Sequence, residues 1–238
     1  MPAVFVRRAA SYFSRYRKAV TGIALKAQIE KPTAVYELIE EIREHRADIF
    51  KDGKWKRADY RDVIKIDFGS QFGICSCHPI QLEEIRPLPQ MFGLEEVGVY
   101  EAGYNWFVDN IVIPLIIIFN KIRKGWGMSF LARLFVWGLN TFSGSQGVVC
   151  VLEAEGEREG KPVKVRIIAR HEDPYDFTAI AVVACMLQYL DDSIVKPGLR
   201  MMGHIVDPTR FLNDMDRMGV KIRTQVTNGN GGGQTSSE

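Results

Sequence analysis

Residues 148–170 read VVCVLEAEGEREGKPVKVRIIAR and carry the clearest fold signal in the chain. Two β-branched runs, 148–155 and 163–170, flank a short polar turn that contains glycine. In the second run, valine and isoleucine alternate with Lys164 and Arg166, which places the apolar side chains on one face. The stretch therefore predicts a β-hairpin with one buried face.

Working outward, apolar periodicity separates further strands from helices. Strands are expected at 62–68, 74–79, 96–102 and 220–226. Helices are expected at 1–31, from Pro32-Thr33 onward, across 104–142, at 177–190 and after Asp207-Pro208, and an irregular loop at 88–93. The helix at 177–190 is apolar on almost every side, which predicts complete burial. Because strands and helices do not alternate regularly, the order favours an α+β fold, a mixed β-sheet flanked by helices.

Three regions are expected. Residues 1–32 are interpreted as a basic amphipathic helical lead-in, because Arg8, Arg15 and Lys18 share one face that is either solvated or in contact with phosphate or lipid. Residues 33–226 hold the α+β domain. Residues 227–238 are rich in Asn, Gly, Gln, Ser and Thr, which predicts a disordered tail.

The composition excludes several classes of protein. Among 238 residues, 31 Lys plus Arg balance 29 Asp plus Glu, so the charge gives no reason to expect nucleic-acid binding. Four cysteines are too few for a disulfide scaffold, which favours a reducing, cytoplasmic location. The most apolar run, Ile111–Phe119, is far shorter than the roughly 20 residues that span a bilayer.

The sequence argues against three kinds of chemical site. The chain has neither a G-x-G-x-x-G turn after a strand nor a P-loop, so a nucleotide phosphate finds no glycine-rich cradle. Cys75, Cys77 and His78 form the densest group of soft ligands, but no second paired spacing completes a metal site. Neighbouring side chains on a strand point to opposite faces, so Cys77 and His78 are not expected to act as a nucleophile and base.

Three segments, which follow one another in the same order as in the family, together resemble the C-terminal part of the saccharopine dehydrogenase-like oxidoreductases. They are HEDPYDFTAIAVVACMLQYLDDSIVKPGLRMMGHIVDPTRFLNDMDRMGVKI at 171–222, FGSQFGICSCHPIQLEEIRPLP at 68–89 and YNWFVDNIVIPL at 104–115. The resemblance implies a Rossmann domain followed by an α+β substrate and dimerisation domain. The coenzyme domain is missing from this sequence, so the chain resembles the C-terminal part alone. On this resemblance, the chain is not expected to be active by itself.

The resemblance also implies chemistry. NAD or NADP is expected to be bound mainly by the missing domain, and an amino-acid-like or imine substrate to be oxidised or reduced, in a homodimer. Substrate contacts are expected from Cys77, His78, Glu83, Arg86, His171 and Thr178. Arg86 would pair with a substrate carboxylate, and His78 or His171 would donate a hydrogen bond or transfer a proton.

One alternative function stays open. Trp126, Phe130, Leu134 and Trp137 recur at helical steps within the aromatic segment 104–142. Such a stripe is either core or a contact surface. The alternative is therefore a non-catalytic interaction or membrane-peripheral module that uses the same fold.

Overall fold

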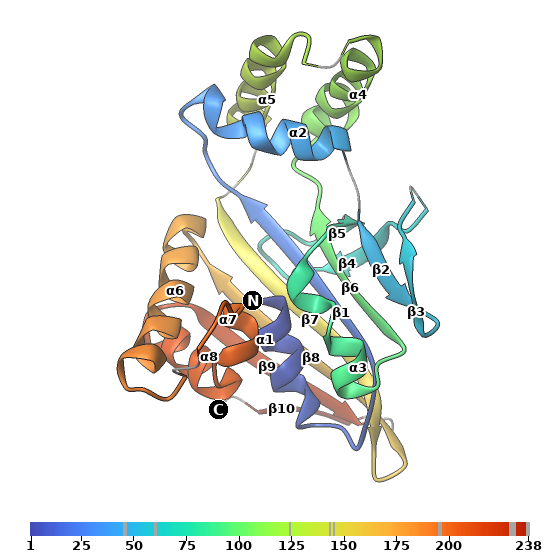
Figure 1. Cartoon of the computed structure of the whole chain (residues 1–238), viewed down its shortest axis with the longest axis vertical. Helices are drawn as coiled ribbons and strands as arrows, with labels where there is room; N and C mark the ends of the chain where they lie inside the picture. The colour runs from blue at the N-terminus through green and yellow to red at the C-terminus, as the bar shows by residue number, and fades with distance from the viewer. Residues whose placement is uncertain are drawn as a thin grey trace.

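The computed structural model describes residues 1–44, 47–59, 61–123, 125–142, 144, 146–194, 197–228 and 232–236. It confirms the α+β class: a mixed, open sheet carries helices on one face and at one end (Figure 1). Within the described residues, the strand order is β10-β9-β8-β7-β1-β6-β2-β3, and β5 with β4 branches from β6.

Five strands form the centre of this sheet. They are β1 (Arg15–Lys26), β6 (Glu96–Ala102), β7 (Gly147–Arg158), β8 (Lys161–His171) and β9 (Lys221–Asn228). β1 and β6 run parallel, whereas β1–β7, β7–β8 and β8–β9 are antiparallel. The predicted hairpin and the strands at 96–102 and 220–226 are confirmed.

One face of the sheet is covered by helices. These are α1 (Pro2–Ala10), α3 (Leu88–Phe92), α6 (Pro174–Leu190), α7 (Met202–Ile205) and α8 (Pro208–Arg217), with the 3-10 turn η2 (Glu83–Ile85) beside them. Phe5 of α1 and Phe211 of α8 are completely buried against Leu152 and Ile167 of the central strands. This is the main hydrophobic core.

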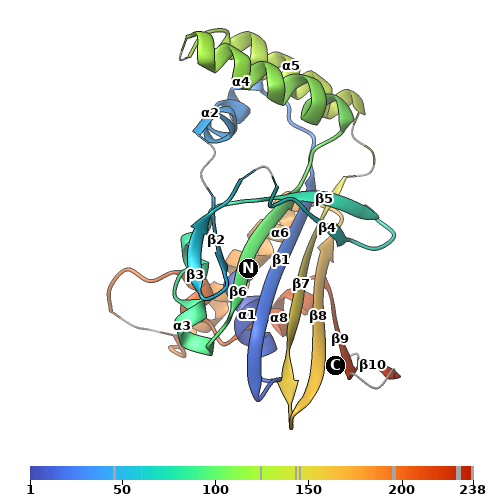
Figure 2. The ribbon, with the colours of Figure 1, turned by 90° about the vertical axis from the view of Figure 1, so that its right-hand side faces the viewer.

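The other face is crossed by the hairpin of β4 (Ile64–Asp67) and β5 (Ile74–Pro79), as Figure 2 shows. Ile66 and Phe68 pack on Val20 of β1 and Val151 of β7. Arg166 of β8 holds the hairpin in place, because its guanidinium donates to the Asp67 carbonyl oxygen. Strands β2 (Asp48–Lys51) and β3 (Lys54–Arg57) extend the sheet past β6.

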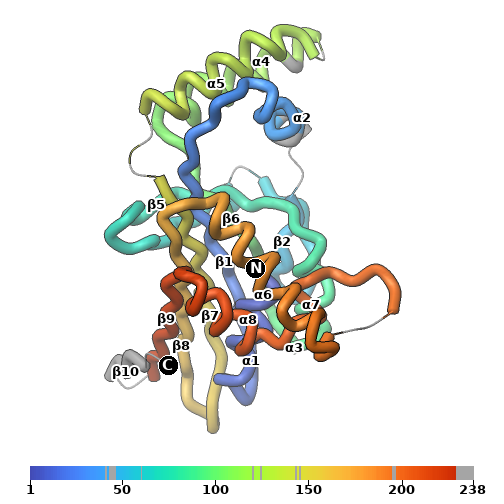
Figure 3. The backbone as a smooth tube through the Cα atoms, turned by 90° about the vertical axis from the view of Figure 1, so that its left-hand side faces the viewer, coloured from blue at the N-terminus to red at the C-terminus, as the bar shows by residue number. Residues whose placement is uncertain are grey.

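A group of helices, here called the helical cap, lies beyond the sheet (Figures 2 and 3). It consists of η1 (Pro32–Val35), α2 (Tyr36–Glu44), the π-helical turn η3 (Val108–Val112), α4 (Ile113–Ile122) and α5 (Met128–Phe142). Ile39, Val112, Ile116 and Phe135 form a separate core between these helices. The cap connects to the sheet after β1 and β6 and before β2 and β7.

The prediction of one helix over 1–31 is wrong after residue 10, because Arg15–Lys26 form β1. Residues 19–22 are buried side by side, since helices cover one face of β1 and the β4–β5 hairpin covers the other. A strand covered on both faces shows no alternation, so its apolar residues imitate helical spacing. Arg15 and Lys18 form ion pairs with Glu95 and Glu96 instead of a basic helix face.

Three smaller expectations also differ from the structure. Residues 88–93 form helix α3, which ends at Gly93 in the left-handed region. Helix α6 is not buried on every side, because Val182, Met186 and Leu190 are exposed. The predicted disorder of 227–238 is wrong for Gly232–Ser236, which pair as β10 with β9; residues 229–231, 237 and 238 lie outside the described part.

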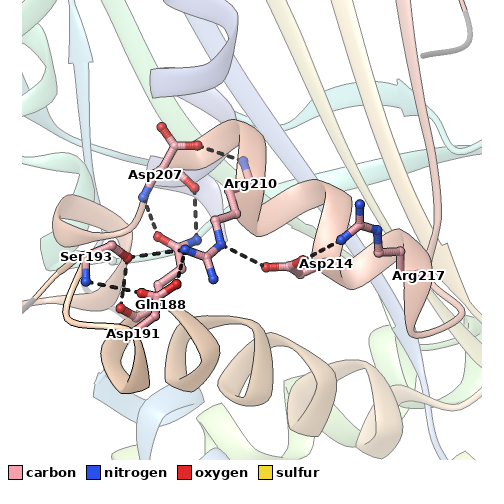
Figure 4. A network of polar contacts seen from close by, with 7 residues as sticks. All are labelled: Gln188, Asp191, Ser193, Asp207, Arg210, Asp214 and Arg217. Carbon is pink, nitrogen blue, oxygen red and sulfur yellow. Dashed lines mark hydrogen bonds and ion pairs between the residues drawn. The ribbon is translucent and has the colours of Figure 1, made fainter.

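A polar network fastens α6 to α8 (Figure 4). The buried side-chain amide of Gln188 accepts from Asp207 N at 2.8 Å and donates to Asp207 O at 3.2 Å. The backbone carbonyl oxygen of Gln188 accepts from Ser193 Oγ at 2.9 Å. Arg210 bridges Asp191 at 2.5 Å and Asp214 at 3.5 Å. Every bond here joins protein groups to one another, so we assign the network a structural role.

Candidate functional site

A small pocket lies where β1 and β6 end. Its volume is about 230 Å³, and its lining comes from the ends of β1 and β6, the start of β5 and the segment leading into η3. The lining residues are Ala24, Leu25, Lys26, Phe72, Cys75, Ser76, Ala102, Gly103, Tyr104, Asn105 and Asp109. The carboxyl ends of parallel strands are a usual place for ligands, because the chain leaves the sheet there and opens a crevice.

Lys26 supplies the positive charge of this pocket. It is the last residue of β1 and shares a strand face with Ala24 and Val20, so it points toward the β4–β5 hairpin. Its Nζ lies 5.4 Å from the centre of the Phe72 ring. Among the described residues it has no ion-pair partner, so its charge is available to a ligand.

Asp109 supplies the negative charge. Its Oδ1 accepts from the Tyr104 backbone N–H at 3.0 Å, and its Oδ2 lies so close to Gly103 that any side chain there would collide with it. Burial raises the pKa of Asp109, while the Tyr104 N–H and the charges of His78 and Lys26 act in the opposite direction. The carboxylate is therefore held in place by the backbone and partly removed from water.

The two charges define what the pocket can bind. A cation and a carboxylate share a lining with the hydroxyl of Ser76, the amide of Asn105 and the apolar surfaces of Leu25 and Phe72. A ligand that carries both a carboxylate and an ammonium group would find an opposite charge for each. The arrangement therefore suits a small zwitterion.

A second, wider groove of about 810 Å³ lies beside it at the same end of the sheet, next to the end of β8. Gln71 of the β4–β5 turn lines this groove, whereas its neighbour Phe72 lines the small pocket. Gln71 donates to Gln146 O at 3.3 Å and lies against Gly147, whose φ of 143° suits glycine. The β4–β5 turn therefore separates the two hollows.

His171 lines the wider groove, together with Arg170, Asp176 and Lys221. Its Nδ1 lies 2.7 Å from the carbonyl oxygen of Asp173 and 3.1 Å from the Asp173 backbone nitrogen. These local contacts orient the ring and leave Nε2 near Gly219, 3.8 Å from where a Cβ would stand. Thr178, one turn into α6, is exposed and donates to Pro174 O at 3.0 Å.

The predicted residues on β5 are near the small pocket but do not line it. Cys77 is completely buried between the hairpin and the sheet, and this burial raises its pKa to about 12, so the thiol is protonated at neutral pH. His78 is exposed, pairs in register with Glu101 and acts electrostatically on Asp109. Cys75 lines the pocket in place of Cys77.

Glu83 and Arg86 belong to a different region, beside β2 and β3. The Arg86 guanidinium contacts Asp48 at 2.7 Å and Glu83 at 2.9 Å, and it lies 5.2 Å from the centre of the Trp55 ring. Both of its charged bonds are therefore made within the protein. The six predicted residues thus fall into three places: β5 beside the small pocket, the wider groove with α6, and this ion-paired corner.

Sequence reasoning missed Lys26 and Asp109. Lys26 does not stand out in the sequence, because a helix is expected over 1–31. The structure shows instead that Lys26 is the last residue of the central strand β1. Asp109 stands in an aromatic and apolar segment that favoured core or contact surface. An isolated carboxylate in the apolar segment 106–119 is the signal that could have revealed it, since buried acids need a reason.

The residues present do not fit a dinucleotide site. At the junction of β8 and α6, the Asp173 side chain already accepts from the N–H groups of Tyr175 and Asp176, and no glycine-rich turn is present. Glu172 and Asp176 would repel phosphate. In the described part of the chain, no group of three or more His, Cys, Asp or Glu is placed to hold a metal ion.

No model of a known protein family matches the chain, and a search of curated proteins finds no match. Among the described helices, none combines the length and the apolar character needed to cross a membrane.

Proposed function

We propose that the chain is the substrate-binding and dimerisation part of a saccharopine dehydrogenase-like, NAD- or NADP-dependent oxidoreductase that acts on an amino-acid-like or imine substrate. The observation that carries the proposal is that Lys26 and Asp109, which carry opposite charges, line the same small pocket. The coenzyme would be bound by another domain, because the residues of this chain do not fit it.

The order of elements supports the proposal. The resemblance implies a strand end, an apolar helix, a Pro-Gly turn, an Asp-Pro helix and a Met-Gly ending, in that order. The chain has β8 ending at His171, then α6, Pro197-Gly198, α8 starting at Pro208, and Met218-Gly219 before β9. Asp173 and Asp207 cap the two helices through their side chains, which explains their place in the pattern.

The pocket gives each substrate group a partner. Lys26 would hold the carboxylate, the role that the sequence suggested for Arg86. Asp109, in its ionised form, would hold the ammonium or iminium nitrogen, and this fixes the carbon beside that nitrogen. A coenzyme held by another domain would supply the hydride chemistry, and the residues of this chain would bind and orient the substrate for it. His78 lies close enough to influence the charge of Asp109.

Dimerisation belongs to the same proposal. Helix α6 presents Val182, Val183, Met186, Leu187 and Leu190 to solvent within the described structure. Exposed apolar surface of this kind is typical of an interface between copies.

The test uses the complete native polypeptide. The transcript upstream of the Met1 codon should encode G-x-G-x-x-G in frame, and the complete enzyme should oxidise NADH or NADPH, or reduce NAD or NADP, only with an amino-acid-like or imine substrate. Lys26→Met and Asp109→Asn should remove this activity, and Lys65→Met, an exposed lysine on β4, should retain it. An in-frame stop upstream, with no co-purifying dinucleotide-binding chain, would overturn the proposal.

A further inference from the structure

The outer surface of the helical cap is apolar and exposed. Helices α4 and α5 lie side by side as the layer farthest from the sheet, with α2 between them and the rest of the molecule (Figures 2 and 3). Large side chains of this layer and its connections are open to solvent: Trp106, Ile111, Ile117, Ile118, Ile122, Trp126, Phe130, Trp137 and Phe142. Ile122 and Trp106 are 67% and 72% exposed.

The cap has a hydrophobic core of its own that does not include these exposed side chains. The cap buries Val112, Ile116, Leu131 and Phe135 between its own helices, so its interior is complete without them. On α5, the exposed Phe130, Arg133 and Trp137 are spaced by three and four residues, which places them on one helix face. The cap is therefore amphipathic, with a second apolar face directed away from its core.

Charge distinguishes the kind of surface that this face fits. No Asp or Glu occurs from residue 110 to residue 152, whereas Lys121, Arg123 and Arg133 are exposed among the apolar side chains. Lys124 lies outside the described residues. The acidic residues of the cap belong to its inner parts, such as Glu37 and Glu40 of α2 and Asp109 at its base.

Tryptophan and helix length point the same way. Three of the four tryptophans in the chain are exposed on the cap, and tryptophan prefers the boundary between lipid headgroups and acyl chains. Helix α4 has 10 residues and α5 has 15, fewer than the roughly 20 needed to cross a bilayer. Such helices lie in the plane of the interface, with their apolar side chains among the acyl chains.

We propose that the outer face of α4 and α5 docks on a membrane surface that contains anionic phospholipid. The exposed Trp, Phe and Ile side chains enter the interface, and Lys121, Arg123 and Arg133 contact lipid phosphates. This docking is independent of the substrate pocket, because Lys26 and Asp109 lie on the sheet side of the cap.

The experiment is co-sedimentation of the full chain with vesicles of phosphatidylcholine and phosphatidylserine, compared with phosphatidylcholine alone. The tryptophans provide a second readout: brominated phosphatidylcholine should quench Trp126 and Trp137, while Trp55, which packs on Phe50 in the sheet, should keep its emission. Binding should favour the anionic vesicles and weaken as salt is added.

Variants separate lipid docking from general stickiness. Ile122→Ser with Phe130→Ser should weaken vesicle binding about tenfold, because both side chains are exposed and contribute apolar area to the interface. Replacing Lys121, Arg123 and Arg133 by Gln should weaken binding to anionic vesicles by about fivefold for each cation. Ile74→Ser with Met91→Ser, equally exposed but on β5 and α3 and not on the cap, is the control and should change nothing.

The proposal fails if the chain does not sediment with anionic vesicles, or if the control variant loses binding as much as the cap variant does. It also fails if the chain self-associates through the cap, so that sedimentation velocity shows a dimer that the cap variant breaks and vesicles do not bind. Far-UV circular dichroism and a thermal melt confirm that each variant is folded.

Discussion

The sheet and the helical cap differ in how far their large apolar side chains are exposed to solvent. On the sheet, Phe5 and Phe211 are fully enclosed, and the β4–β5 hairpin closes the opposite face. On the cap, residues of the same chemical kind, such as Ile118 and Trp126, face solvent. The difference indicates that this chain covers both faces of the sheet itself, whereas the outer layer of the cap, like the outer side of α6, remains exposed and fits another surface.

The largest effect should come from a residue inside the enclosed region. Phe5→Ala should lower the free energy of unfolding by about 4 kcal/mol, because it leaves a cavity between α1 and the sheet. Ile118→Ala on the cap should change it by less than about 1 kcal/mol, because half of that side chain is already in water. Urea titration of both variants measures the contrast, and equal losses would refute it.

A smaller effect should follow from cutting the polar network of α6 and α8. Gln188→Leu should cost about 2–3 kcal/mol, because the fully buried Gln188 side chain makes two hydrogen bonds with the Asp207 backbone and both are lost. Gln90→Leu, at an exposed position of α3, is the matched control. If both variants melt alike, the network does not stabilise the packing of the two helices.

A still smaller loss of stability is expected where Gln71 of the β4–β5 turn lies against Gly147, at the start of β7. Gly147→Ala should cost about 1–2 kcal/mol, because φ is 143° there and the new methyl would displace Gln71. Gly144→Ala, which has open space around it, serves as the control. Unchanged stability of Gly147→Ala in thermal melts would show that Gln71 does not hold the turn closed.

The smallest effect on stability is expected at the seam between sheet and cap. Burial raises the pKa of Asp109, so folding favours its protonated form, and stability falls as pH rises from the ordinary aspartate range through the raised pKa. Asp109→Asn should therefore be at least as stable as the native protein at neutral pH. A clear loss of stability in a melt at neutral pH would make Asp109 a structural residue.

Ligand binding should follow the opposite trend with pH. Only the ionised carboxylate attracts an ammonium group, so affinity should rise as pH increases through the raised pKa of Asp109. The Asn variant should lose this dependence along with most of the affinity. If the affinity does not change across acidic pH, the Asp109 carboxylate does not contact the ligand.

The parts of the fold that the sequence predicts are those with one buried face. The hairpin of 148–170 alternates visibly, and Asp207-Pro208 and Gly219 mark the limits of α8 by local capping chemistry. Strand β1 could not be predicted in this way, because burial on both faces removes the period of two. Only its tertiary partners, one helix layer and one hairpin, make it a strand.

The candidate site was predictable only in part. Of the expected cleft segments 75–86 and 171–178, residues 75 and 76 and residue 171 line hollows at the same end of the sheet, whereas Cys77 and Arg86 do not. Arg86 was expected to pair with a substrate carboxylate, yet it forms an ion pair with Asp48, which lies far away along the chain. Lys26 and Asp109 line one pocket because the parallel pairing of β1 with β6 brings two distant segments together, and no local pattern encodes that pairing.

The most direct test of the Lys26–Asp109 pocket compares three ligands in a two-dimensional amide NMR titration of the chain: L-norleucine, hexanoate and pentylamine. The first carries both charges, and each of the others carries one. L-norleucine should bind at least about tenfold more tightly than either analogue and shift the amide signals of Lys26, Gly103 and Asp109. Equal binding of all three ligands, or shifts confined to other parts of the molecule, would contradict the account.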